Sequence, residues 1–364
     1  MNLEEIFAVM VEKNASDAFI KADSPIHMRI YTEVVEVMEG RYNKESLAKL
    51  VSAIVSERDR ENLHRHRNCE LARYMGNRWR FRIVIFYEKE NFSIVIRRID
   101  LKSLKFSELN LPVNFLENMC KERRGLVLIT GMAGSGKSTT IAAMIEHINT
   151  NYKKHILTIE EPIEFTFEEK KSIINQREVG KDVLSYEDAL RQSVIHSPDV
   201  IYVTNIRDRN TCYAALSAAE TGVLVLSTVH SVNTVSTVER IVNFFPPKEH
   251  DFVLAQLSAL LKGILSLRLI PRVDAEGLIP AYETMTLSST ISGAIRENKL
   301  WEIPKCIASS DIFGMKSFKE CLWELVQAKK ITKESALEYS DEKKELILSM
   351  NLIKHKDELK ERPS

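Results

Sequence analysis

The stretch Gly131-Met-Ala-Gly-Ser-Gly-Lys-Ser138 decides the fold class of this chain, because it matches the phosphate-loop pattern G-x-x-x-x-G-K-[ST] at every fixed position. Before it, Leu126-Val-Leu-Ile-Thr130 is an apolar run typical of a short buried strand, and residues 137–149 have a helical pattern. Strand, loop and helix in this order are the context that the pattern requires. An ordinary glycine-rich turn with a surface lysine is the alternative, and it would require neither flanking element.

The residue types of this loop suit phosphate binding. Glycine lacks a Cβ, so successive backbone N–H groups can turn inward around an anion. The positive end of the following helix adds to the attraction. We expect Lys137 to reach the β- and γ-phosphates of ATP and the Ser138 hydroxyl to ligate Mg²⁺. The residues expected to bind the nucleotide are Gly131, Gly134, Ser135, Gly136, Lys137, Ser138 and Thr139.

Beyond the loop, apolar runs alternate with helical patterns, which indicates an α/β fold with a doubly wound, mostly parallel sheet. The further candidate strands are residues 156–159, 200–203 and 223–227. From about residue 248 the chain alternates helical patterns with short strands around Leu267 and Ile279, so we expect a mostly helical C-terminal part of the domain.

The first hundred residues predict a smaller α+β domain. Leu3, Ile6, Phe7 and Met10 recur at helical spacing, and strand-like runs follow over 18–21, 27–31, 78–86 and 91–99. Residues 101–113 lose regular periodicity. The predicted organisation is therefore an N-terminal domain over 1–100, a linker over 101–113 and the nucleotide-binding domain over 114–364.

Composition excludes several classes of protein. The 364 residues, 44% of them hydrophobic, are enough for two or three packed domains of about 150 residues each. With 51 basic and 51 acidic residues, nothing global attracts the chain to nucleic acid or to an anionic membrane. The five cysteines form no C-x-x-C pair, which favours reduced cytosolic thiols. No apolar segment approaches the ~18 residues of a membrane span, so we expect membrane association only through partners.

Several further motifs, in their order and spacing, resemble the PilT/PilU family of type IV pilus retraction ATPases. The core motifs are Glu160-Glu-Pro-Ile-Glu164, Asn175-Gln-Arg-Glu-Val-Gly180, Ser197-Pro-Asp-Val200, Ala219-Glu-Thr-Gly222 and Phe244-Phe-Pro246. The stretches 10–20, 314–318 and 331–336 resemble PilU-like members. The resemblance implies a PAS-like N-terminal domain joined to a RecA-like ATPase core, a hexameric ring, and ATP bound between the two domains.

The resemblance also assigns site residues. It gives Glu160, Glu161 and Glu164 the role of holding Mg²⁺ and water, with Glu161 where the family usually has Asp. It makes His230 a nucleotide sensor, where otherwise a hydrogen-bonded histidine at a strand end would be the simpler interpretation. The resemblance also implies that four arginines are presented to the nucleotide: Arg80, Arg82, Arg97 and Arg98. Without the resemblance they would be interpreted as surface basic residues.

The main departure from the family pattern follows the strand at Val203. Thr204-Asn205 stands where the family has Gly-Glu, whose glutamate is taken to activate the attacking water. An asparagine cannot accept a proton, and a general base typically contributes ~10²- to 10⁴-fold, or about 3 to 5 kcal/mol of barrier. Val223 in place of a family histidine and His196 in place of an arginine are smaller departures.

Three interpretations remain open at this point. The first is a cytoplasmic, PilU-like subunit of the pilus retraction machinery that serves twitching motility, binds ATP and Mg²⁺ and hydrolyses ATP weakly. It would act as a homohexamer or as the partner of an active retraction ATPase, at the inner-membrane platform protein of the pilus. The second is a competent ATPase that uses Glu160, Glu161 or Glu164 instead of Asn205. The third, a small-molecule P-loop kinase, fits poorly because no acceptor site is evident.

Overall fold

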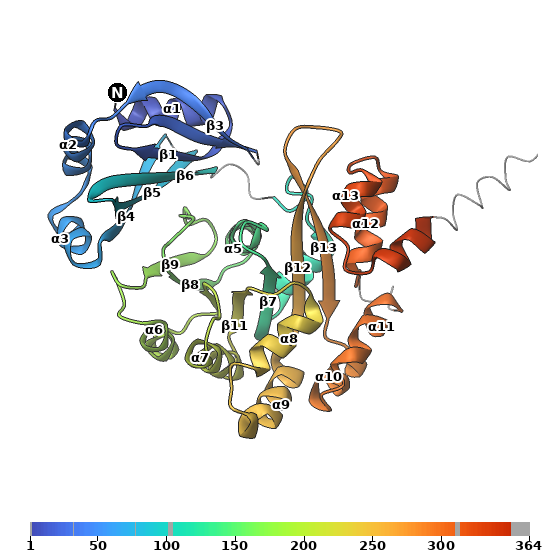
Figure 1. The fold of residues 1–364 in the computed structure, drawn as a ribbon. Coiled ribbons are helices and arrows are strands. Elements are labelled where there is room, and N and C mark those ends of the chain that lie inside the picture. Colours follow the sequence, from blue (N-terminus) through green and yellow to red (C-terminus); the bar gives the residue numbers. More distant parts are fainter. Residues whose placement is uncertain (1, 32, 77, 101–104, 310–313, 351–364) are drawn as a thin grey trace, which may run out of the picture. The chain divides into compact units, whose positions relative to one another are not determined.

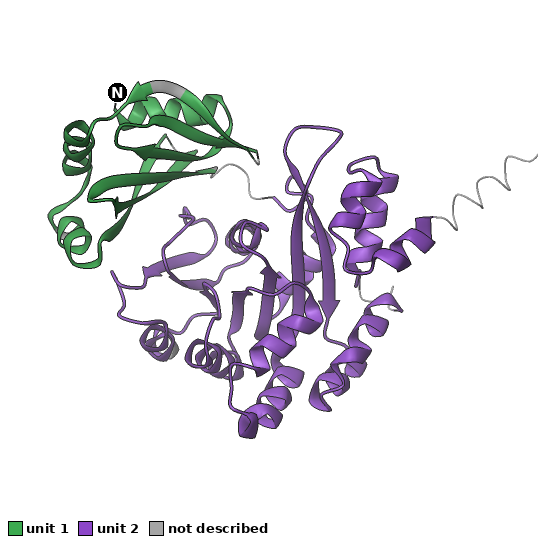
Figure 2. Ribbon diagram, in the orientation of Figure 1, with its two compact units in different colours: residues 1–103 green, residues 104–364 purple. Residues whose placement is uncertain are grey.

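The structure is a computed structural model that describes residues 2–31, 33–76, 78–100, 105–309 and 314–350. It divides into two compact units, residues 1–103 and 104–364 (Figure 2). Part of the predicted linker, residues 101–104, lies outside the described residues, and the first helix of the second unit begins at Val113.

The N-terminal unit is a six-stranded antiparallel sheet with three helices. Its elements are α1 (Leu3–Glu12), β1 (Ala15–Lys21), β2 (Pro25–Ile30), β3 (Glu33–Arg41), α2 (Lys44–Ile54), α3 (Glu57–His66), β4 (Asn68–Met75), β5 (Trp79–Glu88) and β6 (Asn91–Asp100) (Figure 1). The strand order is β3-β2-β1-β6-β5-β4. Its core includes Phe7 of α1 and Phe81 of β5, whose rings stack 3.9 Å apart. This confirms the predicted α+β domain.

The second unit is built on a seven-stranded sheet in the order β13-β12-β7-β11-β10-β8-β9. Its strands are β7 (Gly125–Gly131), β8 (His155–Glu160), β9 (Ile173–Glu178), β10 (Val200–Val203), β11 (Leu224–Val229), β12 (Leu261–Pro271) and β13 (Leu278–Thr286). All neighbours pair in parallel except β12 and β13. The predicted α/β fold is therefore confirmed.

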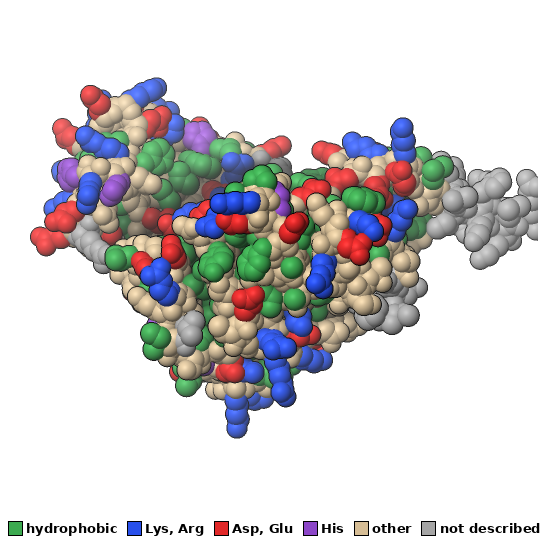
Figure 3. All heavy atoms as spheres, turned by 90° about the horizontal axis from the view of Figure 1, so that it is seen from below, with side chains coloured by type: hydrophobic (Ala, Val, Ile, Leu, Met, Phe, Trp, Pro, Cys, Tyr) green, Lys and Arg blue, Asp and Glu red, His purple; other side chains and the backbone are tan. Residues whose placement is uncertain are grey.

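Helices cover this sheet and continue beyond it. They are α4 (Val113–Lys121), α5 (Lys137–Asn151), α6 (Tyr186–Ser193), α7 (Arg209–Glu220), α8 (Thr234–Val242), α9 (His250–Leu260), α10 (Ser289–Arg296), α11 (Ile303–Ala308), α12 (Phe318–Gln327) and α13 (Lys333–Glu338), with 3₁₀ turns at 194–196, 247–249 and 300–302. In the described ranges no helix is long and apolar enough to cross a bilayer. On the face in Figure 3, acidic and basic side chains are interspersed.

From about residue 248 the chain contains the helices α9 to α13, which confirms the expected mostly helical C-terminal part. The short strands expected around Leu267 and Ile279 are the longer antiparallel pair β12–β13, and β12 lies parallel to β7. Seven of the eleven β12 residues are buried without strict alternation, so periodicity could not indicate the full length of this strand.

The parallel strands place four loops at one edge of the sheet. The carboxyl ends of β7, β8, β10 and β11 lie side by side, because these strands pair in register. The chain leaves them at Gly131, Glu160, Val203 and Val229. Ligands of open α/β sheets bind at this edge.

Candidate functional site

The phosphate loop connects β7, whose seven residues are all buried, to the amino end of α5. Gly131, Gly134 and Gly136 have φ angles of 147°, 77° and 94°, in the region that favours glycine. At Gly131 space is a second constraint. A Cβ there would lie 2.2 Å from Ser135 Oγ and 2.6 Å from the carbonyl oxygen of Leu267. The loop therefore depends on this glycine both for its turn and for its closeness to β12.

Lys137 is held inside the loop rather than in solvent. Its side chain is buried, and Nζ donates to the carbonyl oxygens of Gly131 at 2.8 Å and Met132 at 2.7 Å. Burial lowers the pKa of this amine to about 8, although the nearby Glu164 carboxylate opposes the shift. Two neutral carbonyls stabilise a buried cation less than an anion does. The site therefore favours an anionic ligand that would restore the full charge of Lys137.

Ser135 adds a second indication that the loop fits a phosphate. Its hydroxyl oxygen is buried and has no hydrogen-bond partner among the described residues. A buried hydroxyl without a partner costs about 1–3 kcal/mol. The N–H groups at the start of α5, the Lys137 ammonium and this hydroxyl are donors of the type that bind phosphate oxygens.

The motif Glu160–Glu164, here called the acidic box, has three glutamates. Glu160, the last residue of β8, is its buried member, with 4% of its surface exposed. Its Oε1 accepts hydrogen bonds from Thr158 Oγ1 at 2.7 Å and Gln176 Nε2 at 3.2 Å, and its Oε2 accepts from the Glu164 N–H at 3.3 Å. Burial nevertheless raises its pKa to about 7, because desolvation of the carboxylate outweighs these three bonds.

Ser138, Glu160 and Glu164 line one small pocket beside the first turn of α5. Its other lining residues are apolar or aromatic: Ala142, Ile145, Phe165, Phe167 and Tyr202. One hydroxyl and two carboxylates are the oxygen ligands that Mg²⁺ uses together with substrate phosphates. In the part of the chain that the structure describes, no three His, Cys, Asp or Glu side chains group as a metal site.

Glu161, expected to be a metal ligand, does not line this pocket. Its side chain is 42% exposed and forms an ion pair with Arg207, at 3.0 Å between Oε2 and Nη2. The guanidinium of Arg207 also lies 5.6 Å from the ring centroid of Tyr186. Consecutive side chains point apart where the strand ends, so Glu160 faces inward and Glu161 outward. The structure thus brings Glu164, rather than Glu161, to Ser138.

Asn205 follows β10 in a left-handed backbone conformation, with φ of 59°, which asparagine tolerates better than most residues. Its N–H donates to Thr228 Oγ1 at 3.0 Å, and the N–H of Thr204 donates to the Ile159 carbonyl at 3.0 Å. The Asn205 side-chain oxygen is buried and without a partner among the described residues. An amide oxygen accepts hydrogen bonds, but it cannot take up a proton.

His230 and the two smaller departures lie in different places. His230 follows β11 at the same edge as the loop, and its pKa is lowered by burial and by the charges of Lys137 and Arg240. Val223 precedes β11, and its carbonyl accepts from the N–H of Gly125 at the start of β7. The exposed His196 precedes β10. Val223 and His196 therefore lie toward the amino ends of the strands, away from the phosphate loop of this unit.

The four arginines belong to β5 and β6 of the N-terminal unit. Arg82 pairs with Glu70, with nitrogen–oxygen distances of 2.6 and 2.7 Å, and Arg97 Nε donates to Asp17 Oδ1 at 2.8 Å. The guanidinium of Arg98 lies 4.6 Å from the ring centroid of Trp79. The buried Arg80 guanidinium lies 6.0 Å from the Tyr74 ring, and its Nε has no partner among the described residues. Their proposed action on the nucleotide stays a prediction.

Sequence reasoning missed Thr158 and Gln176, which hold Glu160, and Arg207, which holds Glu161. Thr158 is two residues before Glu160 on one strand, so the period of two could have placed both side chains on one face. Gln176 belongs to a neighbouring strand that was not predicted, because a half-exposed polar segment carries a weak strand signal.

Comparisons with known proteins agree with this geometry. The family model described as type II/IV secretion system protein matches residues 2–347. Similar relatives from Pseudomonas aeruginosa are the type IV pilus ATPase PilU, 34% identical over 98% of this chain and 93% of its own length, and the retraction ATPase PilT, 35% identical over 93% and 98%. A crystal structure of the pilus retraction motor PilT with bound ADP is similar at a TM-score of 0.85, with 36% identity over 95% of this chain and 98% of that one.

Proposed function

This chain belongs to the type II/IV secretion system protein family, and within it we propose that the chain is an ATP-binding subunit of a type IV pilus retraction machinery. The observation that carries the proposal is the phosphate loop, with its buried Lys137 and its unpartnered Ser135 hydroxyl, in a chain similar over nearly its whole length to PilU and PilT. Lys137 would bind the β- and γ-phosphates.

The pocket beside α5 supports Mg²⁺ as the companion of the nucleotide. Ser138 and Glu160, with Glu164, would hold the ion, whose charge would offset that of the phosphates. Within this arrangement Glu160 has to be ionised, and its three hydrogen bonds stabilise that form.

We further propose that hydrolysis is weak. Asn205 has an acceptor oxygen but no capacity for proton transfer, and general-base catalysis typically contributes ~10²- to 10⁴-fold. In the assembled ring, four arginines would bind the nucleotide: Arg80, Arg82, Arg97 and Arg98. They would offset the charge of the phosphates, but they would not replace the missing general base.

A competent ATPase is the second candidate, and one observation favours it. The pKa of Glu160 is raised to about 7 by burial, which is the range that suits a general base at neutral pH, and Glu160 shares a pocket with Ser138. In that case Glu160 would take the role that Asn205 cannot fill.

Binding and turnover measured on one preparation test both candidates. We expect micromolar ATP binding that Lys137→Ala reduces at least tenfold, whereas Lys153→Ala, at an exposed lysine, leaves it unchanged. Turnover below about 0.01 s⁻¹ supports the weak-hydrolysis proposal, because typical enzymes reach 1–10³ s⁻¹. Turnover above about 1 s⁻¹ that Lys137→Ala abolishes would establish the competent ATPase instead, and no ATP binding would refute both.

Assembly and location complete the proposal. By likeness to pilus motors, the chain would form a hexameric ring, or join the ring of an active retraction ATPase, and would meet the inner-membrane platform protein on the cytoplasmic side. Light scattering with ATP present measures the oligomeric state. A monomer at micromolar concentration, alone and with the active ATPase of the same cell, would contradict it.

A further inference from the structure

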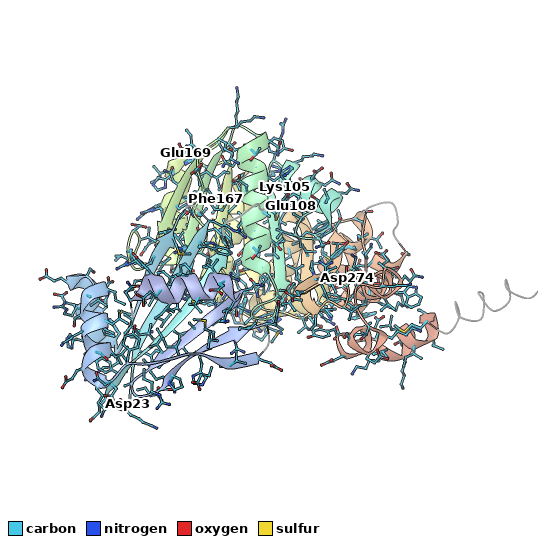
Figure 4. The ribbon with its side chains drawn as sticks, turned by 90° about the horizontal axis from the view of Figure 1, so that it is seen from above. Asp23, Lys105, Glu108, Phe167, Glu169 and Asp274 are labelled. Atoms are coloured by element: carbon cyan, nitrogen blue, oxygen red, sulfur yellow. The ribbon has the colours of Figure 1, made fainter. Side chains whose placement is uncertain are left out.

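Gln176, on the edge strand β9, bonds to Glu160 at the end of β8 and to two backbone groups of the acidic segment that follows it, residues 161–170. Its Nε2 donates to Glu160 Oε1 at 3.2 Å and to the Phe165 carbonyl at 2.7 Å. Its Oε1 accepts from the N–H of Phe167 at 3.2 Å. Figure 4 labels Phe167 and, two residues later, Glu169. One amide group thus uses both donor and acceptor to fix the backbone of this segment and one carboxylate oxygen of the site.

The pairing of β8 with β9 explains how Gln176 reaches Glu160. The two strands are parallel, and Thr158 lies directly opposite Gln176 in the register. Register partners in a sheet point to the same face, and so does Glu160, two residues after Thr158. Both side chains therefore converge on Glu160 Oε1, Thr158 from 2.7 Å and Gln176 from 3.2 Å.

A purely structural role is the competing explanation, and Asn149 shows what such a role looks like. Asn149 Nδ2 donates to the Glu168 carbonyl at 2.8 Å, and its Oδ1 accepts from the Lys170 N–H at 3.0 Å, so it anchors the far end of the same segment. Its one bond to a carboxylate, to Glu146 Oε2 at 3.4 Å, ends outside the pocket of Ser138 and Glu160. Gln176 differs because one of its bonds ends on a site carboxylate. That bond favours the ionised form of Glu160, since an amide N–H donates more strongly to a carboxylate than to a carboxylic acid.

We propose that Gln176 is a positioning residue for Glu160, orienting this carboxylate toward Mg²⁺-nucleotide beside Ser138. The proposal rests on the proposed function in so far as a metal-bound nucleotide occupies this pocket. The orientation of Glu160 itself does not depend on that function, and it is measured separately below.

The test compares Gln176→Met with Gln256→Met. Gln256 is a matched control because it also donates to a glutamate, Glu220 Oε1 at 2.7 Å, between α9 and α7. The first readout is affinity for a fluorescent ATP analogue with Mg²⁺ and with EDTA. We expect Gln176→Met to reduce the Mg²⁺-dependent gain at least fivefold and to leave the affinity in EDTA within twofold, whereas Gln256→Met changes neither.

The second readout is the pH dependence of thermal unfolding without nucleotide, each variant measured with and without Glu160→Gln. For each variant, the difference between the measurements with and without Glu160→Gln isolates the titration of Glu160 from that of its neighbours. The titratable groups that face it are Glu164 in the segment, Glu178 on β9, Tyr202 on β10 and Tyr186 on α6. Loss of a donor to the carboxylate should move the Glu160 midpoint to higher pH in Gln176→Met, and also in Thr158→Val, which leaves the backbone bonds of Gln176 in place.

The outcomes separate the two ideas. A shifted midpoint together with a reduced Mg²⁺ effect supports the positioning role. If Gln176→Met only lowers the melting temperature, as Gln256→Met does, with an unshifted midpoint and an intact Mg²⁺ effect, Gln176 is a structural residue and the proposal is overturned. If the wild type binds no nucleotide, the proposed function fails, and the midpoint alone then decides whether Gln176 orients Glu160.

Discussion

Replacement of Glu160 by glutamine should stabilise the protein at alkaline pH while it impairs the site. The carboxyl is 4% exposed, and burial raises its pKa from 4.5 to about 7. A carboxyl with a raised folded-state pKa contributes no penalty below pH 4.5, where both states are protonated. Its penalty grows between pH 4.5 and 7, because only the unfolded chain ionises freely. At pH 8 the penalty is about 3 kcal/mol, at 1.36 kcal/mol per pKa unit.

Glutamine removes this penalty and one hydrogen bond. Its Oε1 can still accept from Thr158 and Gln176, but its amide nitrogen cannot accept from the N–H of Glu164, a loss of about 1 kcal/mol. The expected net effect at pH 8 is a gain of about 2 kcal/mol. In a unit of this size that raises the melting temperature by about 4–8 °C. At pH 5 the remaining penalty is below 1 kcal/mol, so the two terms nearly cancel and the melting temperature should not change.

Calorimetry at pH 5, 6, 7 and 8, without nucleotide or divalent metal, measures this difference. Glu168→Gln, at an exposed glutamate two residues before the exposed Lys170, is the control and should change nothing at any pH. Two results would refute the reasoning: a Glu160→Gln variant that is less stable than the wild type at pH 8, or one whose melting temperature is shifted equally at all pH values. Either would mean that the ionised carboxylate is well solvated. The same variant should lose the Mg²⁺-dependent part of ATP binding.

Three further predictions concern the loop and the edge of the sheet. The pKa of Lys137 is lowered to about 8, so Mg²⁺-ATP binding at pH 8 should take up about half a proton, measured by calorimetry in two buffers of different ionisation heat; no uptake would mean that the phosphate does not meet this amine. Gly131→Ala should cost at least ~3 kcal/mol of stability in urea unfolding, because its Cβ would overlap Ser135 Oγ, whereas Gly134→Ala, with open space around its Cβ, should cost only ~1 kcal/mol for its positive φ; equal costs would contradict the loop geometry. Thr204→Gly with Asn205→Glu should raise ATP turnover by ~10² or more if the lost general base is the sole defect, and an unchanged rate would place the limitation elsewhere.

The sequence could predict what depends on local pattern. The phosphate loop, its flanking strand and helix, and the strands ending at Glu160, Val203 and Val229 follow from short apolar runs and turn residues, and the structure confirms them as elements. The strand β12 was expected only as a short strand, because a strand buried on both faces has no period of two. Helix α3 was missed because it is mostly polar and exposed, and strand β3 was missed because its apolar residues Val34, Val35 and Val37 do not alternate regularly.

The site shows the same limit at the level of single side chains. The acidic box could be located from sequence, but the choice between Glu161 and Glu164 as the companion of Ser138 depends on how the segment turns after β8. That turn is fixed by Gln176 and Asn149, which lie on other elements, and by the ion pair of Glu161 with Arg207. Such contacts join residues far apart in the chain, and no local pattern encodes them.

Asn205, Val223 and His196 depart from the family pattern. Their positions in the fold leave Asn205 as the one on which the proposal of weak hydrolysis depends. Val223 and His196 lie at the amino ends of their strands, so within this unit neither can act on the phosphates bound at the carboxyl edge. At that edge Lys137, Ser138 and Glu160 are the residues proposed to bind nucleotide and metal, although the charge of Glu160 destabilises the ligand-free fold above pH 7. A cation in the pocket would remove that penalty, because it favours the ionised carboxylate. Under the proposed function, binding and folding would therefore be coupled through Glu160, whereas proton transfer from water would depend on whether any carboxylate replaces Asn205. The two functions would then be separable, because different loops of the same sheet edge would carry them.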